Sequence, residues 1–243
     1  MKDKLGHDFA FWTGYYGNNC VSWASNKAYL DMNRTMTFQE KIHNGNKERH
    51  KQIEQNRKNW RDFGTGIIEA NIRKGTEDFN QWHHDTCGDL IRYYDADNKL
   101  VSRQDGGHAS LTYGQAQKWL NMTLKYLWLL YRLELVNDPA IGAFVQKHQK
   151  TFHVPLDSYI LRYVARQNQS KKNPFSTQDN ELTGSFDEFW ETFRSTWSQI
   201  NDCEKYFAYQ KQLAEATRED SPLKWELIHW RKALDYYGKI TNE

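Results

Sequence analysis

The segment from Gln115 to Arg132 is the part of the sequence that most constrains the fold. Its apolar residues would cover most sides of a helix, and they are Trp119, Leu120, Met122, Leu124, Tyr126, Leu127, Leu129 and Leu130. A helix that is apolar on most sides is stable in water only when other elements surround it. The segment therefore predicts a central buried helix with the rest of the chain packed around it.

Helical patterns also dominate the C-terminal part of the chain. Ser185 stands three residues before a glutamate, as in a capping box, and aromatic residues then follow at spacings of three and four. Ser221 and the proline after it provide a cap and a first-turn residue ahead of another apolar stripe. Only four prolines occur in 243 residues. We predict an all-α fold of about eight to ten helices in one globular unit of residues 1–243, with C-terminal helices over residues 185–238.

Three stretches lack helical periodicity and predict connections between helices. Residues 167–184 are rich in Asn, Ser, Lys and Gln and predict an exposed, flexible loop. Pro139 and the segment Phe152–Pro155 bracket a second connection, after which an amphipathic helix starts near Ile160. Residues 100–107 fit either a short hairpin or a loop.

Composition excludes several classes of protein. Aromatic residues make up 15% of the chain, unlike the aromatic-poor composition of disordered proteins. No apolar run approaches the roughly 20 residues of a membrane-spanning helix, and the N-terminal residues MKDKLGH do not open a secretory signal. Three widely spaced cysteines argue against a disulfide framework. We therefore expect an intracellular protein, cytoplasmic and associated with the nucleoid.

One small cluster suggests a metal site. His83, His84 and Cys87 lie close together in the sequence, but the chain offers no second ligand pair at a zinc-binding spacing. A core or surface role is more common for residues of these types. We therefore expect neither a metal ion nor another cofactor.

Charge is distributed unevenly, although the formal net charge is only +2. Lys41–Arg61 contains seven basic and two acidic residues, whereas Thr177–Asp220 has an excess of acidic residues. Such asymmetry fits a protein that turns one face toward phosphates. Lys51, Arg57 and Lys58 are its candidate contacts. For this run taken alone, a solvated charged helix is the more common explanation.

Two segments carry a family resemblance. Leu111–Met122 reads LTYGQAQKWLNM, and Leu156–Arg162 reads LDSYILR. They resemble the two signature segments of the helix-hairpin-helix DNA glycosylase superfamily, written roughly L-P-G-V-G-x-K-T-A-N and V-D-x-H-V-x-R. The resemblance covers residues 111–165. The hairpin segment has one glycine and no proline, and the gap between the two segments is longer than in most of the family. An archaeal 8-oxoguanine branch shares both departures.

The resemblance implies an all-α fold with a degenerate helix-hairpin-helix element, and it assigns roles to particular residues. Asp157 falls on the family's catalytic aspartate, and Lys118 on the nucleophilic lysine of its bifunctional members. Contacts to the DNA backbone are expected from Gly114, Gln115, Gln117, Tyr159 and Arg162, in addition to the basic run. Base-pocket candidates are Trp119, Met122, Trp225 and Trp230.

These residue types suit the chemistry that the resemblance implies. A fixed carboxylate stabilises the oxocarbenium ion that forms as a base departs, and an unprotonated lysine can attack the sugar to give a Schiff base and strand cleavage. The expected partner is double-stranded DNA with a flipped, modified base, bound by a monomer. Either a damaged base such as 8-oxoguanine or a hypermodified phage base fits, and hence DNA repair or antiviral defence.

Two alternatives from other classes stay open. A lone aspartate at a helix start is most often a cap, and a lone lysine on an apolar helix is most often a surface residue. With those roles for Asp157 and Lys118, the chain is a non-catalytic helical DNA-binding module or a protein-interaction factor.

Overall fold

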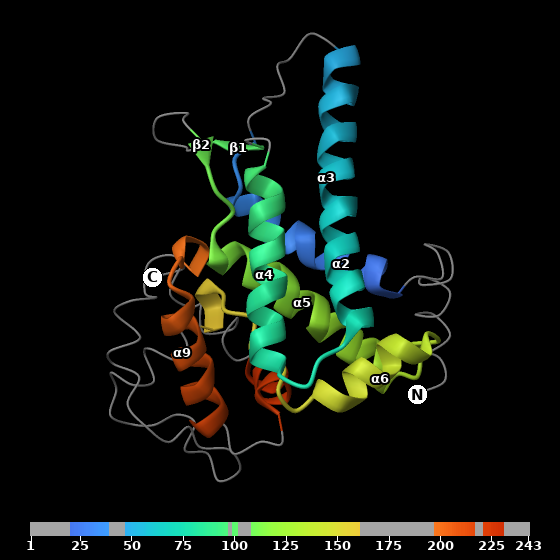
Figure 1. The fold of residues 1–243 in the computed structure, drawn as a ribbon, viewed down its shortest axis with the longest axis vertical. Helices are drawn as coiled ribbons and strands as arrows, with labels where there is room; N and C mark the ends of the chain where they lie inside the picture. The colour runs from blue at the N-terminus through green and yellow to red at the C-terminus, as the bar shows by residue number, and fades with distance from the viewer. Residues whose placement is uncertain are drawn as a thin grey trace, which may run out of the picture.

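The computed structural model describes residues 20–38, 47–96, 99–101, 108–160, 197–216 and 221–230. Its helices are α2 (Cys20–Met32), α3 (Lys47–Lys74), α4 (Phe79–Asp95), α5 (Tyr113–Arg132), α6 (Pro139–His148) and α9 (Cys203–Ala216), with single 3-10 turns η1 (Asn33–Thr35) and η2 (Trp197–Gln199). Figure 1 shows this arrangement. Residues 158–160 and 222–230 are helical as well. The all-α prediction is confirmed.

Helix α5 lies in the middle of the described helices (Figure 1) and packs against α2, α4, α6 and η2. Every residue of α5 is buried except four near its C-terminal end: Tyr126, Leu129, Tyr131 and Arg132. A capping box starts the helix, because the Thr112 hydroxyl accepts from the Gln115 amide and the Gln115 side chain accepts from the Thr112 amide. The prediction of a central buried helix is therefore confirmed.

Trp119 shows how closely the surrounding helices approach α5. Its ring is fully buried, and its indole nitrogen donates to the carbonyl of Ser25 on α2 at 3.0 Å. A Cβ at Gly64 of α3 would lie only 2.3 Å from the ring. Glycine at this position therefore lets α3 pass directly over Trp119, which belongs to the core that α2, α3 and α5 share.

The predicted connections have mixed outcomes. Pro139 does not mark a connection: it is the first residue of α6, and the Asp138 side chain caps this helix by accepting from the amides of Ala140 and Ile141. The prediction was wrong because Asp-Pro is also a helix-start signal. By contrast, residues 152–157 are irregular and a helix follows from residue 158, as expected.

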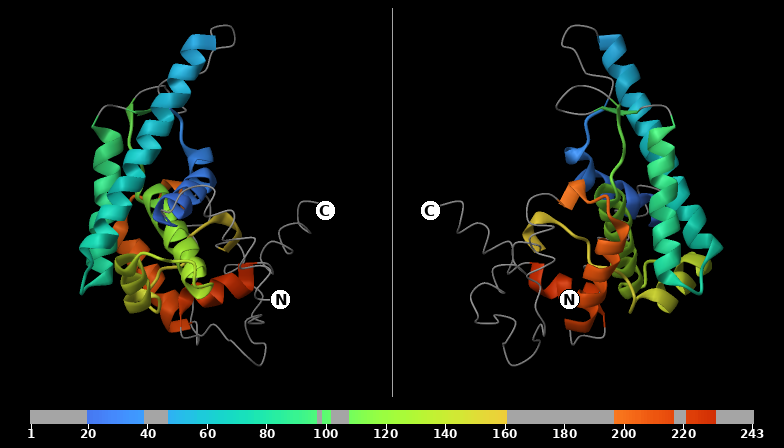
Figure 2. Two further views of the ribbon diagram at one scale, coloured as in Figure 1. Left: turned by 90° about the vertical axis from the view of Figure 1, so that its right-hand side faces the viewer. Right: turned by 60° about the vertical axis from the view of Figure 1, so that its left-hand side comes forward.

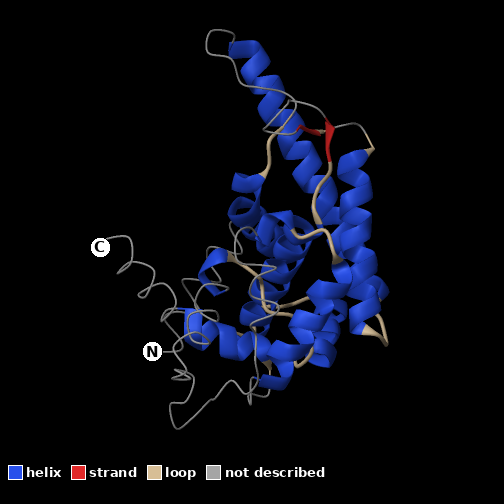
Figure 3. Ribbon diagram, turned by 90° about the vertical axis from the view of Figure 1, so that its left-hand side faces the viewer, coloured by secondary structure: helices blue, strands red, loops and turns tan. Residues whose placement is uncertain are grey.

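The remaining expectations concern short segments. The hairpin alternative is supported by an antiparallel pair of two-residue strands, β1 (Leu100–Val101) and β2 (His108–Ala109), drawn red in Figure 3. The C-terminal helix that the Ser221 signal predicts is present over residues 222–230. The predicted loop at 167–184 lies outside the described residues, as does the predicted helix from Ser185 up to η2.

Helix α3 projects beyond the other described helices (Figure 2). Lys51, Arg57 and Lys58 lie in its first half, where Lys51 and Lys58 are exposed. Two of these cations have partners within the chain: Lys58 pairs with Asp62 at 2.7 Å, and the Arg57 guanidinium lies 4.6 Å from the centre of the Phe38 ring. Of the helices described, none combines the length and the apolar character that crossing a membrane requires.

Candidate functional site

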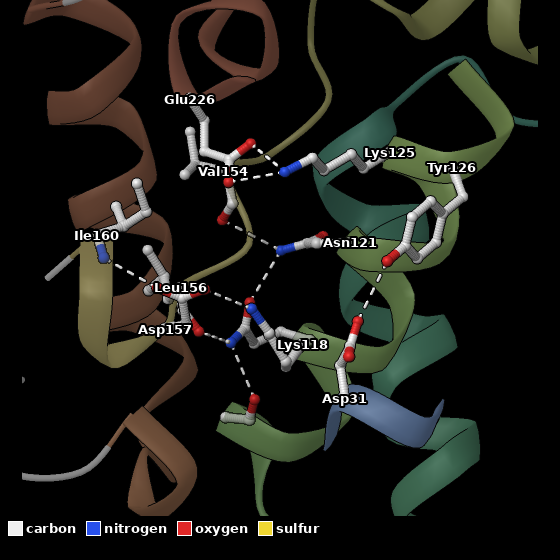
Figure 4. A network of polar contacts seen from close by, with 12 residues as sticks. Asp31, Lys118, Asn121, Lys125, Tyr126, Val154, Leu156, Asp157, Ile160 and Glu226 are labelled. Atoms are coloured by element: carbon white, nitrogen blue, oxygen red, sulfur yellow. Dashed lines mark hydrogen bonds and ion pairs between the residues drawn. The ribbon is translucent and has the colours of Figure 1, made fainter. Parts of the chain in front are cut away.

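Lys118 and Asp157 form an ion pair, although 39 residues separate them in the sequence. The lysine Nζ lies 2.8 Å from the aspartate Oδ2, and the two side chains are only 6% and 14% exposed. Figure 4 shows the lysine reaching from α5 toward the segment that carries Asp157. The other carboxylate oxygen, Oδ1, accepts from the amide of Ile160 at 2.9 Å. Asp157 therefore caps the following helix while it binds the lysine.

Side-chain amides hold the irregular segment that leads to Asp157. Gln210 of α9 donates to the Val154 carbonyl at 2.7 Å and accepts from the Val154 amide at 3.0 Å. Gln117 of α5 donates to the carbonyl of Leu156 at 3.4 Å. Buried main-chain groups outside regular structure need such partners. These contacts fix the backbone immediately before the catalytic candidate Asp157.

A buried hydrogen-bond network continues from this segment into the core. Asn121 lies 2.9 Å from the Nε2 of His83 and donates to the Tyr206 hydroxyl at 2.8 Å. That hydroxyl lies 3.1 Å from the Nδ1 of His153. Burial lowers the pKa of His83 to about 3 and holds the pKa of His153 well below its ordinary value. Both imidazoles are therefore neutral at physiological pH.

The histidine–cysteine cluster does not form a metal centre in the part of the chain that the structure describes. His83 and Cys87 are buried within the core, whereas His84 is exposed. Across the described residues, no three His, Cys, Asp or Glu side chains are grouped so as to hold a metal ion. His83 instead serves the network around Asn121.

A cavity of about 620 Å³ lies beside the Lys118–Asp157 pair. Its apolar walls come from Met122, Leu129, Trp197, Leu227 and Trp230. Its polar lining comes from Asp31, Arg34, Thr35, Lys118, Lys125, Tyr126, Asp157, Ser158 and Tyr159. This volume is within the range that is common for ligand sites in proteins.

A second buried ion pair lies at this cavity. The Nζ of Lys125 lies 2.6 Å from Oε2 of Glu226, and the side chains are 9% and 1% exposed (Figure 4). Burial raises the pKa of Glu226, and the ammonium of Lys125 opposes that change. Lys125 follows Lys118 by two helical turns, so both lysines lie on one face of α5, about 10.5 Å apart along its axis.

The two pairs share a further feature, because the Nζ of each lysine lies near the ring of a tryptophan. Lys118 Nζ is 5.9 Å from the Trp197 ring centre, and Lys125 Nζ is 6.0 Å from that of Trp230. The pair of Lys125 and Glu226 was not predicted. The helical spacing of the two lysines was a usable signal, but nothing near Glu226 indicated its partner.

The structure contradicts the expected contact of Gly114 with a DNA phosphate. Gly114 belongs to the first turn of α5 rather than to an open hairpin turn, and its amide donates to the carbonyl of Ile200 at 2.8 Å. A Cβ at this position would lie 1.9 Å from the carbonyl oxygen of Trp197. The glycine is therefore required for close packing against η2.

Two neighbouring predictions fail for a related reason. The buried Gln115 side chain donates to the carbonyl and the hydroxyl of Thr35, in addition to its place in the capping box. Gln117 is fully buried and bonds to Asn121 and to main-chain carbonyls. Neither glutamine faces outward to a DNA backbone. Tyr159 does line the cavity, and Arg162 lies outside the described residues.

The base-pocket candidates divide into two groups. Met122 and Trp230 line the cavity, as expected of pocket walls. Trp119 and Trp225 do not, because both are fully buried in the core; Trp225 stacks on His229 with ring centres 4.8 Å apart. Their assignment to a base pocket was wrong, because a resemblance between short segments does not show which tryptophans the packed helices bury.

Comparisons of the chain with protein-family models, with curated proteins and with solved structures found no match. The site is therefore defined by its own geometry. It consists of a buried lysine–aspartate pair at a helix start, a second buried lysine–glutamate pair on the same face of α5, and a cavity with aromatic walls to which both pairs are adjacent.

Proposed function

We propose that this protein is a DNA glycosylase whose active site is the cavity beside Lys118 and Asp157. One observation carries the proposal: the two residues that the family resemblance singles out lie 2.8 Å apart, next to a cavity, despite their separation in sequence. A resemblance confined to short segments would not by itself bring a lysine and an aspartate together.

The proposed reaction breaks the N-glycosidic bond of a nucleotide flipped into the cavity. As the base departs with the bonding electrons, the carboxylate of Asp157 stabilises the positive charge on the sugar. For direct attack at C1′, Asp157 relays one proton of the Lys118 ammonium to the departing base and is a carboxylate again when the sugar carries the positive charge, and the neutral amine then forms the new bond. A second proton of the attached amine passes through Asp157 to the ring oxygen as the sugar ring opens to a Schiff base. If water attacks instead, an intact abasic site results.

The proposed base pocket lies between Met122 and Trp230. An ammonium group can only donate hydrogen bonds, so Lys125 suits a base edge that presents a carbonyl acceptor. Guanine, thymine, uracil and cytosine derivatives each carry a carbonyl oxygen, whereas adenine carries none. The proposal covers damaged bases such as 8-oxoguanine and hypermodified phage bases that keep this carbonyl.

Duplexes that carry 8-oxoguanine, uracil, alkylated bases or plain and glucosylated hydroxymethylcytosine test the proposal. Base release is measured by alkali treatment and gel analysis, and borohydride is added to trap a Schiff base. We expect release from at least one duplex, loss of release in Asp157→Asn and loss of the trapped adduct in Lys118→Ala.

A matched control is available on the surface. Lys147 and Glu77 form an exposed ion pair with an N–O distance of 2.6 Å, and Lys147→Ala should retain both release and trapping. Full activity of Asp157→Asn, or no release from any duplex, would contradict the glycosylase proposal. DNA binding without release in the wild-type protein would favour the non-catalytic binding module.

A further inference from the structure

Stability alone does not account for the buried ion pair of Lys125 and Glu226. The two side chains are 9% and 1% exposed, so both charges have lost most of their hydration. Replacement of a buried ion pair by apolar residues of similar volume is often neutral or stabilising. The position of this pair beside a cavity therefore points to a ligand as the reason for its charges.

Glu226 leaves one N–H group of Lys125 for a ligand. The Nζ of Lys125 donates to Oε1 of Glu226 at 2.9 Å and lies 2.6 Å from Oε2 (Figure 4). The carboxylate thus accepts at most two of the three N–H groups that an ammonium carries. Lys125 lines the cavity, and Glu226 is not part of the lining. Within the residues that the structure describes, Glu226 holds the ammonium from the protein side, and the third N–H can meet an acceptor in the cavity.

The surroundings of Lys125 suit the base of a nucleotide. Its Nζ lies 6.0 Å from the centre of the Trp230 ring, which gives this end of the cavity an aromatic wall. Asp157 lines the cavity at the other lysine, Lys118. The two pairs share one electrostatic environment: burial is the main cause of the raised pKa of Glu226, and the charge of Asp157 adds to the rise. A nucleotide whose sugar faces Asp157 can therefore extend its base along α5 toward Lys125.

We infer that Lys125 binds a carbonyl oxygen of the extruded base and stabilises the negative charge that develops on the base as its glycosidic bond breaks. The role in bond breaking rests on the proposed function, whereas the carbonyl contact rests on the cavity and on the third N–H group. Adenine has no carbonyl oxygen, so the contact selects against it. The substrate class is bases with a carbonyl conjugated to the glycosidic nitrogen, such as uracil, hypoxanthine and 8-oxoguanine.

The step separates two opposite charges, and the site has a group for each. As the bond breaks, its electron pair passes to the glycosidic nitrogen, and the conjugated carbonyl takes part of the charge until the base takes up a proton. Lys125 donates a hydrogen bond to the carbonyl oxygen and keeps its own protons. Asp157 acts on the positive charge of the sugar at the same time.

Nucleotides with fluorine at the 2′ position of an arabinose sugar test the carbonyl contact without base release, because the fluorine opposes positive charge on the sugar. Duplexes carry such a nucleotide with uracil, hypoxanthine, 8-oxoguanine or adenine. Affinities are measured for the wild-type protein and for the double variant Lys125→Met with Glu226→Leu, which leaves neither charge buried and unpaired. The same double change in an exposed pair, Lys147→Met with Glu77→Leu, is the control. The free deoxynucleosides are tested in parallel.

We expect the wild-type protein to bind at least one carbonyl-bearing base about 10- to 100-fold more tightly than adenine. The double variant should lose this preference, and the control should keep it. Urea unfolding shows whether the variants are folded. A preference among the free deoxynucleosides but not among the duplexes identifies a free nucleoside as the source of the base.

Single-turnover base release from ordinary deoxyribose tests the role in bond breaking. Release by the double variant should be about 100- to 1000-fold slower than release by the wild type. The loss should be smaller for a derivative of the same base with an electron-withdrawing substituent, because its anion needs less stabilisation. A structural defect would slow both bases by the same factor.

Equal wild-type affinity for adenine and for every carbonyl-bearing base would overturn the carbonyl contact, and this comparison decides even where the double variant fails to fold. An unchanged preference in a folded double variant would overturn it as well. Equal losses of release for the two leaving groups would overturn the role in bond breaking. A preference that depends on Lys125 without base release from any duplex would refute the glycosylase and keep the contact. Base release without that preference would do the reverse.

Discussion

Acid should destabilise this protein as the pH falls below about 6.5, because neutral imidazoles are buried in the core. Burial lowers the pKa of His83 to about 3, compared with about 6.5 in an unfolded chain. Between these two values the unfolded state binds a proton that the folded state does not. The stabilising effect of a neutral His83 is therefore complete above pH 6.5 and is lost progressively as the pH falls toward 3.

The size of the effect follows from the shift. Between pH 6.5 and pH 5, an interval of about 1.5 units, the unfolded chain binds a proton at His83 and the folded protein does not. At about 1.36 kcal/mol per unit, this difference lowers the free energy of unfolding by about 2 kcal/mol. His153, whose ring centre lies 4.7 Å from that of His83, has a lowered pKa as well and adds to the loss. The total is a substantial part of the roughly 5–15 kcal/mol that stabilises a typical domain.

Urea unfolding at pH 7.5, 6.0 and 5.0, followed by circular dichroism and tryptophan fluorescence, measures this loss. His83→Gln should be less stable than the wild type at pH 7.5, yet it should lose about 2 kcal/mol less on going to pH 5. His84→Gln is the matched control, since its side chain is exposed one position along α4. A wild-type free energy of unfolding that is equal at pH 7.5 and 5.0 would refute the reasoning, as would a wild-type pH dependence in His83→Gln.

Three further predictions concern packing and the second ion pair. Gly114→Ala should lower the free energy of unfolding by about 1–3 kcal/mol, because the new Cβ would collide with the Trp197 carbonyl. Gly66→Ala should raise it by about 0.5–1 kcal/mol, because no atom lies within 4 Å of the new Cβ. Urea unfolding compares the two variants. Trp225→Ala should lower the free energy of unfolding by about 3–5 kcal/mol. Trp230→Ala should leave the melting temperature nearly unchanged and impair turnover. Equal decreases of the melting temperature in the two variants would contradict the assignment of Trp225 to the core and Trp230 to the cavity. Lys125→Met should lower the free energy of unfolding by about 3–5 kcal/mol, because it leaves Glu226 buried and unpaired. The double variant Lys125→Met with Glu226→Leu should recover most of this loss in the same unfolding assay.

The sequence by itself determined the features that depend on neighbouring residues. Apolar residues on most sides of residues 115–132 required a buried helix, and α5 is that helix. Ser221 and the proline after it marked a helix start, and residues 222–230 are helical. Such features follow from backbone hydrogen bonds and burial within a few turns, so a local pattern specifies them.

Only the tertiary structure decided which side chains meet. Glu226 pairs with Lys125 across 101 residues, and no local pattern encodes a partner at that distance. The family resemblance assigned Gly114 to a hairpin turn that contacts a phosphate, but η2 packs so close to Gly114 that a side chain there would collide with the Trp197 carbonyl. Trp225 and Trp230 lie in the same helical segment, residues 222–230, yet one is core and the other borders the cavity. In each case the deciding quantity is the distance to a segment remote in sequence, which is set when the helices pack and not before.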